Sequence, residues 1–357
     1  MNDLSGLSTP VLDHFHRQAL VCRKLGSRFT CRLLECIGDH LKARIANPDP
    51  LERNILDWPG DPAIDALALR LAGGFHALVL DGRTAPLTAL DDEALAAAVD
   101  RIMVEESAWL ADFIDHPPQT NEVARSGVLA PGFLAIDALT DGRPMRLLEL
   151  GSSAGLNQLW PRFRYETADW FWGDDASPVM LRPAWEGSPP PLRMPDIRSI
   201  AGVDLRPIDV RDPAWRLRLR SYIWADQDER LQRLDAALAL AMQSPPDIDA
   251  ASADHWLESR LADAPSDVTN IVFHSIVWQY FPDEVRQRCE KAMTEAAAQG
   301  IPVAWLRMEG HPEGGHAVLE LDLLEPGAAK RRRLHLADCH FHGAWVRWYG
   351  TERPISG

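Results

Sequence analysis

The sequence predicts an α/β protein whose mainly parallel, Rossmann-like sheet follows an all-helical N-terminal region. Within residues 1–140, apolar side chains recur at helical spacing, and no strand-like alternation competes with them. From Arg146 onward, short apolar runs alternate with amphipathic segments, which is typical of a parallel sheet with helical crossovers. The tail carries two further strand-like runs around Glu325-Pro326-Gly327, and these predict an antiparallel pair at the C-terminal end.

The N-terminal residues 1–140 are expected to form a helical cap domain. A first helix contains His14 and His16, which lie two residues apart and so on different faces. Gly73-Gly74 weakens one of the later helical patterns, and His116-Pro117-Pro118 breaks another. The further predicted helices run from Ser27 to the stop at Asn47-Pro48, and over residues 63–80, 91–115 and 119–139.

Residues 141–357 are expected to form the α/β domain. Residues 160–198 fit its pattern poorly, because they combine several tryptophans with the run Pro189–Pro191. We interpret them as an insertion that leaves the sheet as a hairpin or loop. The predicted strands are 147–150, 200–210, a short one within 245–254, 270–277, 302–308, 317–324 and 334–349, with helices over 226–242, around Trp256 and over 283–299.

Composition limits the classes of function. The formal net charge of −15 argues against a general nucleic-acid binder, and the short run Lys330–Arg333 is typical of a solvated turn. The five cysteines include no Cys-x-x-Cys pair, so they indicate neither disulfides nor zinc. No signal peptide and no apolar stretch of membrane-spanning length is visible. We therefore expect a cytoplasmic protein with no membrane partner. The sequence does not specify its oligomeric state.

The most informative stretch is Arg146–Asn157, which reads as a strand, a Gly/Ser-rich turn and the start of a helix. Backbone N–H groups at the positive end of a helix can bind an anion or a polar cofactor. Two incompatible chemistries fit this layout. Glu149-x-Gly151-x-x-x-Gly155 resembles the first motif of class I S-adenosylmethionine-dependent methyltransferases, whereas Gly151-x-Ser153-x-Gly155 satisfies the nucleophile elbow of α/β-hydrolases.

Several stretches together resemble a bacterial, functionally uncharacterised family of methyltransferase-like proteins. The resemblance covers nearly the whole chain, and it implies a Rossmann-like class I methyltransferase sheet behind an N-terminal helical region. It is specific as to family and weak as to activity. The stretches that carry it are Gln119–Glu122, Glu149–Asn157, Gly202–Leu205, His274–Tyr280 and Gly343–Trp348.

Under the methyltransferase interpretation, Gly151 and Gly155 let the backbone approach the methionine part of S-adenosylmethionine without Cβ clashes. Glu149 anchors the turn or receives the cofactor's ammonium through water, while Asp204 resembles the acid that binds ribose hydroxyls. Asp254 is assigned to the adenine amino group. The remaining candidates are Ser153, Asn157 and Ser275 for the cofactor, Gln119, Asn121, Trp278 and Tyr280 for the substrate, and His274 and Glu122 as proton acceptors.

Two departures from the methyltransferase pattern matter. Ser153 stands where a glycine is often found, and the gap from Gly151 to Asp204 exceeds the roughly twenty residues of a compact βαβ unit. An insertion at 160–198 explains the gap. Without it, the ribose role passes to one of three other acids, namely Asp169, Asp174 or Asp175.

Other chemistries stay open. A serine hydrolase would use Ser153 as nucleophile, with Asp322 and His340 following in the required order. Against it, too few strands precede the turn. An NAD-dependent oxidoreductase needs Gly-x-Gly-x-x-Gly, which Ser153 and Asn157 break. Asp338, His340 and His342 lack a further metal ligand from elsewhere, and we predict no metal site. A non-catalytic binding module is the third alternative.

We predict transfer of a methyl group from S-adenosylmethionine to a small molecule that binds between the sheet and the helical cap. The absence of an Asn-Pro-Pro-Tyr-type sequence after the fourth strand argues against nucleic-acid bases as acceptors. The acceptor itself is not specified by the sequence.

Overall fold

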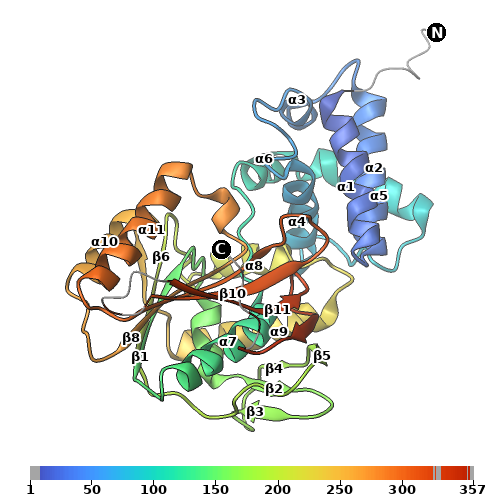
Figure 1. The fold of residues 1–357 in the computed structure, drawn as a ribbon. Helices are drawn as coiled ribbons and strands as arrows, with labels where there is room; N and C mark the ends of the chain where they lie inside the picture. The colour runs from blue at the N-terminus through green and yellow to red at the C-terminus, as the bar shows by residue number, and fades with distance from the viewer. Residues whose placement is uncertain (1–8, 325, 327–330, 352, 354–357) are drawn as a thin grey trace. The chain divides into compact units, whose positions relative to one another are not determined.

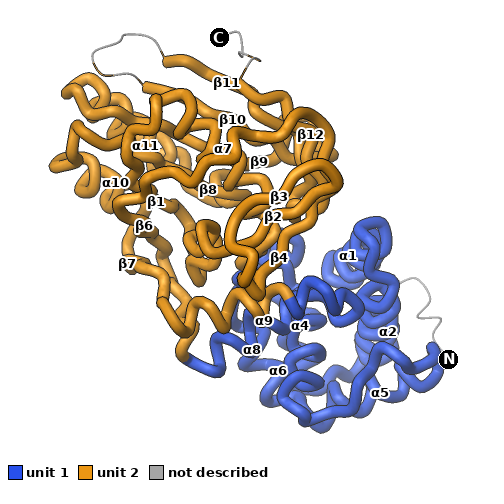
Figure 2. The backbone as a smooth tube through the Cα atoms, turned by 90° about the horizontal axis from the view of Figure 1, so that it is seen from below, with its two compact units in different colours: residues 1–120, 212–232 blue, residues 121–211, 233–357 orange. Residues whose placement is uncertain are grey.

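The protein is described by a computed structural model that covers residues 9–324, 326, 331–351 and 353. The chain divides into two compact units (Figure 2). The helical unit comprises residues 1–120 and 212–232, and the sheet unit comprises residues 121–211 and 233–357. The expected cap of residues 1–140 thus differs from the helical unit in two segments. Residues 121–140 belong to the sheet unit, and residues 212–232 belong to the helical unit.

Seven helices of the described chain lie in the helical unit (Figure 1). Ser27 begins α2 because its Oγ accepts a hydrogen bond from Thr30 N at 3.1 Å. The helix expected over 91–115 is two helices that meet at Glu106. The bounds are α1 Pro10–Lys24, α2 Arg28–Arg44, α3 Pro50–Leu56, α4 Leu67–Leu80, α5 Asp92–Glu105, α6 Ser107–Ile114 and α8 Pro213–Ser221.

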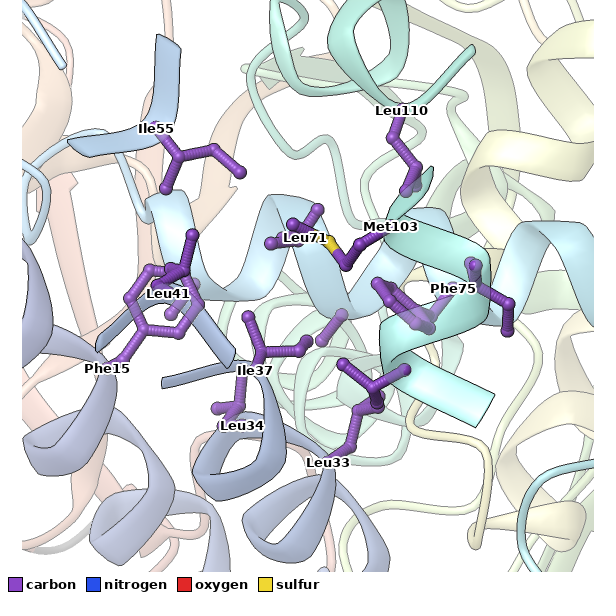
Figure 3. Close-up of a cluster of buried hydrophobic side chains, with 14 of the residues drawn as sticks. Phe15, Leu33, Leu34, Ile37, Leu41, Ile55, Leu71, Phe75, Met103 and Leu110 are labelled. Carbon is purple, nitrogen blue, oxygen red and sulfur yellow. The ribbon is translucent and has the colours of Figure 1, made fainter. Parts of the chain in front are cut away.

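The core of the helical unit consists of apolar side chains from several helices (Figure 3). Phe15, Ile37 and Phe75 are completely buried there. Gly73-Gly74 is part of this packing rather than a weak point of α4. A Cβ at Gly73 would lie 2.7 Å from the Tyr222 ring, and one at Gly74 would lie 2.8 Å from Leu110. The two glycines therefore let neighbouring elements approach α4 closely.

The sheet unit contains a nine-stranded sheet in the order β5-β12-β11-β10-β9-β8-β1-β6-β7. The five neighbours from β7 to β9 pair in parallel, whereas β9 to β12 pair antiparallel. The mixed α/β class, the mostly parallel sheet and the helical N-terminal region are therefore confirmed. The strands are β1 Met145–Leu150, β5 Ala184–Glu186, β6 Ile197–Asp204, β7 Ile248–Ala250, β8 Thr269–Ser275, β9 Val303–Gly310, β10 Ala317–Leu324, β11 Arg331–Cys339 and β12 Trp345–Trp348.

Numbered along the chain, the five parallel strands lie in the order 3-2-1-4-5. The chain runs outward from β1 to β7 and then returns to the other side of β1 to form β8. This reversal is the topological switch point, and ligands of open α/β sheets bind outside the carboxyl ends of the strands there. The edge formed by the ends of β1, β6 and β8 is therefore the place to look for a site.

Helices cover both faces of the sheet. Leu148 and Leu150 of β1 pack with Leu257 of α10 (Ala253–Ala262) and Met293 of α11 (Asp283–Ala298). On the opposite face, α7 (Ser126–Leu139) brings Phe133 against Phe273 of β8, with ring centroids 5.0 Å apart. The remaining helices of this unit are α9 Asp228–Gln243, which starts in the helical unit, and the 3-10 turns η1 Val123–Arg125, η2 Leu156–Arg162 and η3 Trp278–Tyr280.

The expected insertion forms a small sheet of its own. β2 (Arg164–Glu166) lies between β3 (Phe171–Gly173) and β4 (Met180–Leu181), and β5 then joins the edge of the large sheet beside β12. The predicted strand 334–349 is two strands, β11 and β12. The predicted linker residues Glu325 and Gly327, like Lys330, lie outside the described residues. No helix of the described chain is long and apolar enough to span a membrane.

Candidate functional site

The turn after β1 is built from residues with positive φ. Gly151, Ser153 and Gly155 have φ of 70°, 55° and 67°. A serine in this conformation is uncommon, because its Cβ crowds the backbone where glycine would not. The glycine expected midway in the motif is therefore replaced by a residue that adopts the glycine-like conformation at some cost.

The turn does not lead into the α-helix that we expected. Residues Leu156–Arg162 form a 3-10 stretch interrupted by Pro161, which lacks the aligned dipoles of a long α-helix. Several turn N–H groups are already used. Gly151 and Ser152 donate to Val203 O, and Leu156 N donates to Asn121 Oδ1 at 2.7 Å. The α-helix expected after the turn is thus wrong, and most of the turn N–H groups are used within the protein.

Both motif glycines face other parts of the protein. A Cβ at Gly151 would lie 2.5 Å from Val277 Cγ2, and one at Gly155 would lie 2.5 Å from Pro246 Cβ. The close approach that these glycines permit is therefore made in this structure by Val277 and Pro246, where we had expected a ligand.

Polar side-chain atoms without hydrogen-bond partners gather at this turn. Among the described residues, Glu149 Oε2, Ser153 Oγ and Gln158 Nε2 are buried and form no hydrogen bond of good geometry, although the Gln158 side chain lies close enough to the Glu149 carboxyl to lower its pKa. Leaving such a group unpaired costs about 1–3 kcal/mol each. Gly202 of β6 makes room for this cluster, since a Cβ there would lie 2.4 Å from Gln158 Nε2. An acceptor, a hydroxyl and an amide donor are thus placed together at the end of β1.

Glu149 is the titratable centre of this cluster. Glu149 is 3% exposed, and burial raises the pKa of its carboxyl to about 7. Hydrogen bonding from the Gln158 and Ser152 side chains offsets this rise in pKa only in part, and the charge of Asp204 raises the pKa further. Near neutral pH, this carboxyl can therefore exist with or without its proton.

Asp204 closes the turn from β6. Its Oδ2 accepts from Ser153 N at 2.8 Å and its Oδ1 accepts from Arg206 N at 2.9 Å. Because each carboxylate oxygen accepts two hydrogen bonds, capacity remains for a ligand hydroxyl. Asn157 Oδ1 accepts from Ser126 Oγ at 2.8 Å, so this residue ties the turn to α7.

His274 is fully buried, and both of its ring nitrogens are paired within the protein. The Trp305 indole N–H donates to Nε2 at 3.0 Å, so Nδ1 carries the proton and donates to Glu309 Oε1 at 2.6 Å. The ring also stacks on Trp278 with centroids 4.8 Å apart. The role of proton acceptor predicted for His274 is therefore not favoured, because neither nitrogen faces a substrate.

The sheet register also separates His274 from the turn. Glu149 is the register partner of Phe273, whose ring contacts α7. Since successive side chains of a strand point to opposite faces, His274 points to the face covered by α10 and α11. Glu149, Ser153 and Asp204 are thus brought together on one side, while His274 and Trp278 lie on the other.

The other predicted residues are dispersed. Asp254 lies in the first turn of α10, where it pairs with Ser252 and with Arg288 at 3.2 Å. Glu122 caps η1, its Oε1 accepting from Ala124 N at 3.1 Å. Ser275 ends β8, and its carbonyl accepts from Arg125. The remaining two are Tyr280, which is 73% exposed, and Gln119, which belongs to the helical unit.

No hydrolase triad is assembled around Ser153 in the described structure. Its hydroxyl is buried, and the predicted acid Asp322 pairs with Arg307, Arg331 and Arg333. The predicted base His340 accepts at Nδ1 from His342 N. Within the described residues, no group of three His, Cys, Asp or Glu side chains is arranged to hold a metal ion.

Two residues of this edge were missed at the level of sequence. Gln158 carries no motif and could not have been found. Glu309 ends a buried strand with an acid, the same signal that identified Asp204, and could have been. Burial acts to raise the pKa of Glu309, but hydrogen bonds from His274 and from the Val277 and Trp278 amides lower it below its ordinary value.

The model of a family described as uncharacterized proteins conserved in bacteria (DUF2332) matches residues 13–348. The chain belongs to this family. No curated protein and no solved structure matches the chain.

Proposed function

We propose that the protein binds S-adenosylmethionine at the carboxyl end of β1 and transfers its methyl group to a small molecule. The observation that carries the proposal is the cluster of buried polar atoms without well-formed hydrogen bonds at Glu149, Ser153 and Gln158, at the switch point of a sheet with strand order 3-2-1-4-5. Resemblance to class I methyltransferases in Glu149-x-Gly151-x-x-x-Gly155 supports it, and so does the sheet order.

The donor set fits the cofactor. An amino-acid group needs an acceptor for its ammonium and donors for its carboxylate, and Glu149 Oε2 offers the former while Gln158 Nε2 and Ser153 Oγ offer the latter. Asp204 retains acceptor capacity for ribose hydroxyls. Negative charge from Glu149 and Asp204 also suits a positively charged sulfonium compound. Asp254 has no part in this arrangement, because Arg288 and Ser252 occupy it.

When bound, the cofactor supplies an electrophilic methyl group for in-line displacement. The chain's residues then have to align the acceptor and exclude water. His274 orients the loop after β8 rather than accepting a proton. Glu122 stays our predicted proton acceptor, since it directly follows Asn121, whose side chain contacts the turn at Leu156 N.

A non-catalytic binding protein is the second candidate, and a specific observation favours it. Val277 fills the space beside Gly151, and both nitrogens of His274 are paired, so His274 is not available for the proton transfer that a catalytic acceptor step requires. Such a protein would bind an adenosyl compound without turnover.

Calorimetry with S-adenosylmethionine, S-adenosylhomocysteine and NAD tests the proposal. We expect both adenosyl compounds to bind the wild type at sub-millimolar concentration and NAD not to bind. Asp204→Asn should weaken binding at least tenfold. Asp209→Asn is the matched control, because Asp209 is exposed and pairs with Arg211 in the same segment.

Absence of adenosyl binding would remove the cofactor proposal, whereas binding without consumption in the presence of candidate acceptors would favour the non-catalytic alternative. A fluorophosphonate probe should leave Ser153 unlabelled. Labelling of Ser153 would revive the hydrolase alternative.

A further inference from the structure

We infer that Glu309 is a positioning residue of this edge: it holds the loop after β8, residues 276–281, against the turn after β1 and so limits access to that turn. The access part rests on the proposed function, because the ligand it concerns is an adenosyl compound. The hold on the loop does not depend on the identity of the ligand.

Three hydrogen bonds to one carboxylate oxygen of Glu309 fix the loop, and we call this set of contacts the hold. Glu309 Oε1 accepts from His274 Nδ1 at 2.6 Å, from Val277 N at 3.1 Å and from Trp278 N at 3.2 Å. Hydrogen bonds to an ionised acceptor are about twice as strong as neutral ones. One acid at the end of β9 therefore fixes two consecutive amides of the loop.

The fixed amide of Val277 determines where its side chain lies. The Val277 methyl groups pack on Gly151, leaving no room there for even a Cβ. A ligand that approaches the backbone at Gly151 must therefore displace Val277. Because the Val277 amide is bonded to Glu309, that displacement strains or breaks the hold.

The loop is also held in an unfavourable backbone conformation. Ile276 has φ of 51°, which is a rare conformation for a β-branched residue, and its N donates to Met308 O at 2.8 Å. Strained residues of this kind persist only where the surroundings impose them. Release of the Glu309 contacts would remove part of the constraint that keeps Ile276 in this conformation.

Amide hydrogen exchange, measured by NMR on the full chain, tests the hold. In Glu309→Ala, we expect the Val277 and Trp278 amides to exchange at least about tenfold faster, while Val272 and Phe273 in β8 change less than about twofold. Glu309→Gln should give a smaller acceleration, because its amide oxygen still accepts. Glu320→Gln is the control, since Glu320 pairs with Arg307.

Unchanged protection of Val277 and Trp278 in Glu309→Ala would overturn the inference, and so would equal acceleration throughout β8, which indicates general destabilisation. Association of S-adenosylhomocysteine, followed by stopped flow, should be faster in Glu309→Ala. An unchanged association rate would overturn the access part. If the amides open but the ligand binds neither protein, the proposed function fails while the hold by Glu309 stands.

Discussion

Two buried histidines, one in each unit, have every ring nitrogen paired, yet their partners differ. His40 of α2 lies between two carboxylates, with Nε2 2.8 Å from Glu52 and Nδ1 2.5 Å from Asp100. Each ring nitrogen of His40 therefore faces a carboxylate oxygen. His274 lies between Glu309 and the Trp305 N–H, so it is a neutral ring in a single tautomer.

A buried histidine with a carboxylate partner therefore does not by itself indicate a ligand-binding or catalytic site. His40 sits in a fully paired arrangement that joins α2 to α3 and α5. The edge near His274 is distinguished by something else, namely the unpaired atoms of Glu149, Ser153 and Gln158 and the positive φ of Ile276. Substitutions at these residues distinguish hydrogen bonds that only stabilise the fold from polar groups that are available to a ligand.

The largest effect is expected at His40. His40→Leu leaves the buried Glu52 carboxyl without its side-chain partner, and breaking a buried pair in this way costs about 3–5 kcal/mol. Asp100→Asn should cost less than about 1 kcal/mol, because the Asp100 side chain is 64% exposed. Urea unfolding measures both. Equal losses in the two variants would contradict the view that the buried contact with Glu52 matters more than the exposed contact with Asp100.

Glu149 is expected to make stability depend on pH. Its folded-state pKa of about 7 lies above its ordinary value, so the folded protein binds the extra proton and loses stability as pH rises from about 4.5 to 7. Glu149→Gln removes that loss and should raise the free energy of unfolding at pH 8 by up to about 3 kcal/mol. The gain should vanish near pH 4.5. A gain independent of pH would show that the Glu149 carboxyl is not the titrating group.

The pairing of His274 is tested by Trp305→Phe, which removes the N–H donor and leaves Nε2 unpaired. We expect a loss of about 1–3 kcal/mol. Trp256→Phe is the matched control, since the Trp256 N–H donates to Asp249, whose side chain is half exposed. Its loss should be smaller by about 1 kcal/mol. Similar losses would mean that ring volume, and not the hydrogen bond, decides.

The smallest effect is expected at Ser153. Ser153→Gly relieves the positive φ and removes a buried unpaired hydroxyl, so it should raise the free energy of unfolding by about 1 kcal/mol. Ser152→Gly should have the opposite sign, because Ser152 Oγ donates to Glu149 O. Destabilisation by Ser153→Gly would argue that the hydroxyl has a partner after all.

Regular elements were predictable from sequence because their apolar residues form either periodic patterns or continuous runs. β8 is buried along almost its whole length, and Ser27 caps α2 as its residue type suggests. The packing of distant segments of the chain against one another was not predictable. Residues 212–232 join the helical unit through contacts such as Tyr222 on Gly73, which no local pattern encodes.

The site was predictable in the same uneven way. Glu149 and Asp204 end strands that the apolar runs identify, and they do meet at the turn. The placement of His274 was not predictable, because one sequence does not show which face of β8 points to the turn, nor that the Trp305 N–H would donate to Nε2. Gln158 depends on the 3-10 geometry after the turn and on the room that Gly202 leaves.

The central claim, that the turn after β1 is a ligand site, is tested most directly by ¹H–¹⁵N NMR during titration with S-adenosylhomocysteine. We expect saturable shift changes concentrated in residues 149–158 and 276–281, with the amides of α1 to α6 unchanged. No change up to about 1 mM ligand, roughly the weak limit of specific binding, would contradict the claim. Changes confined to other parts of the chain would contradict it as well.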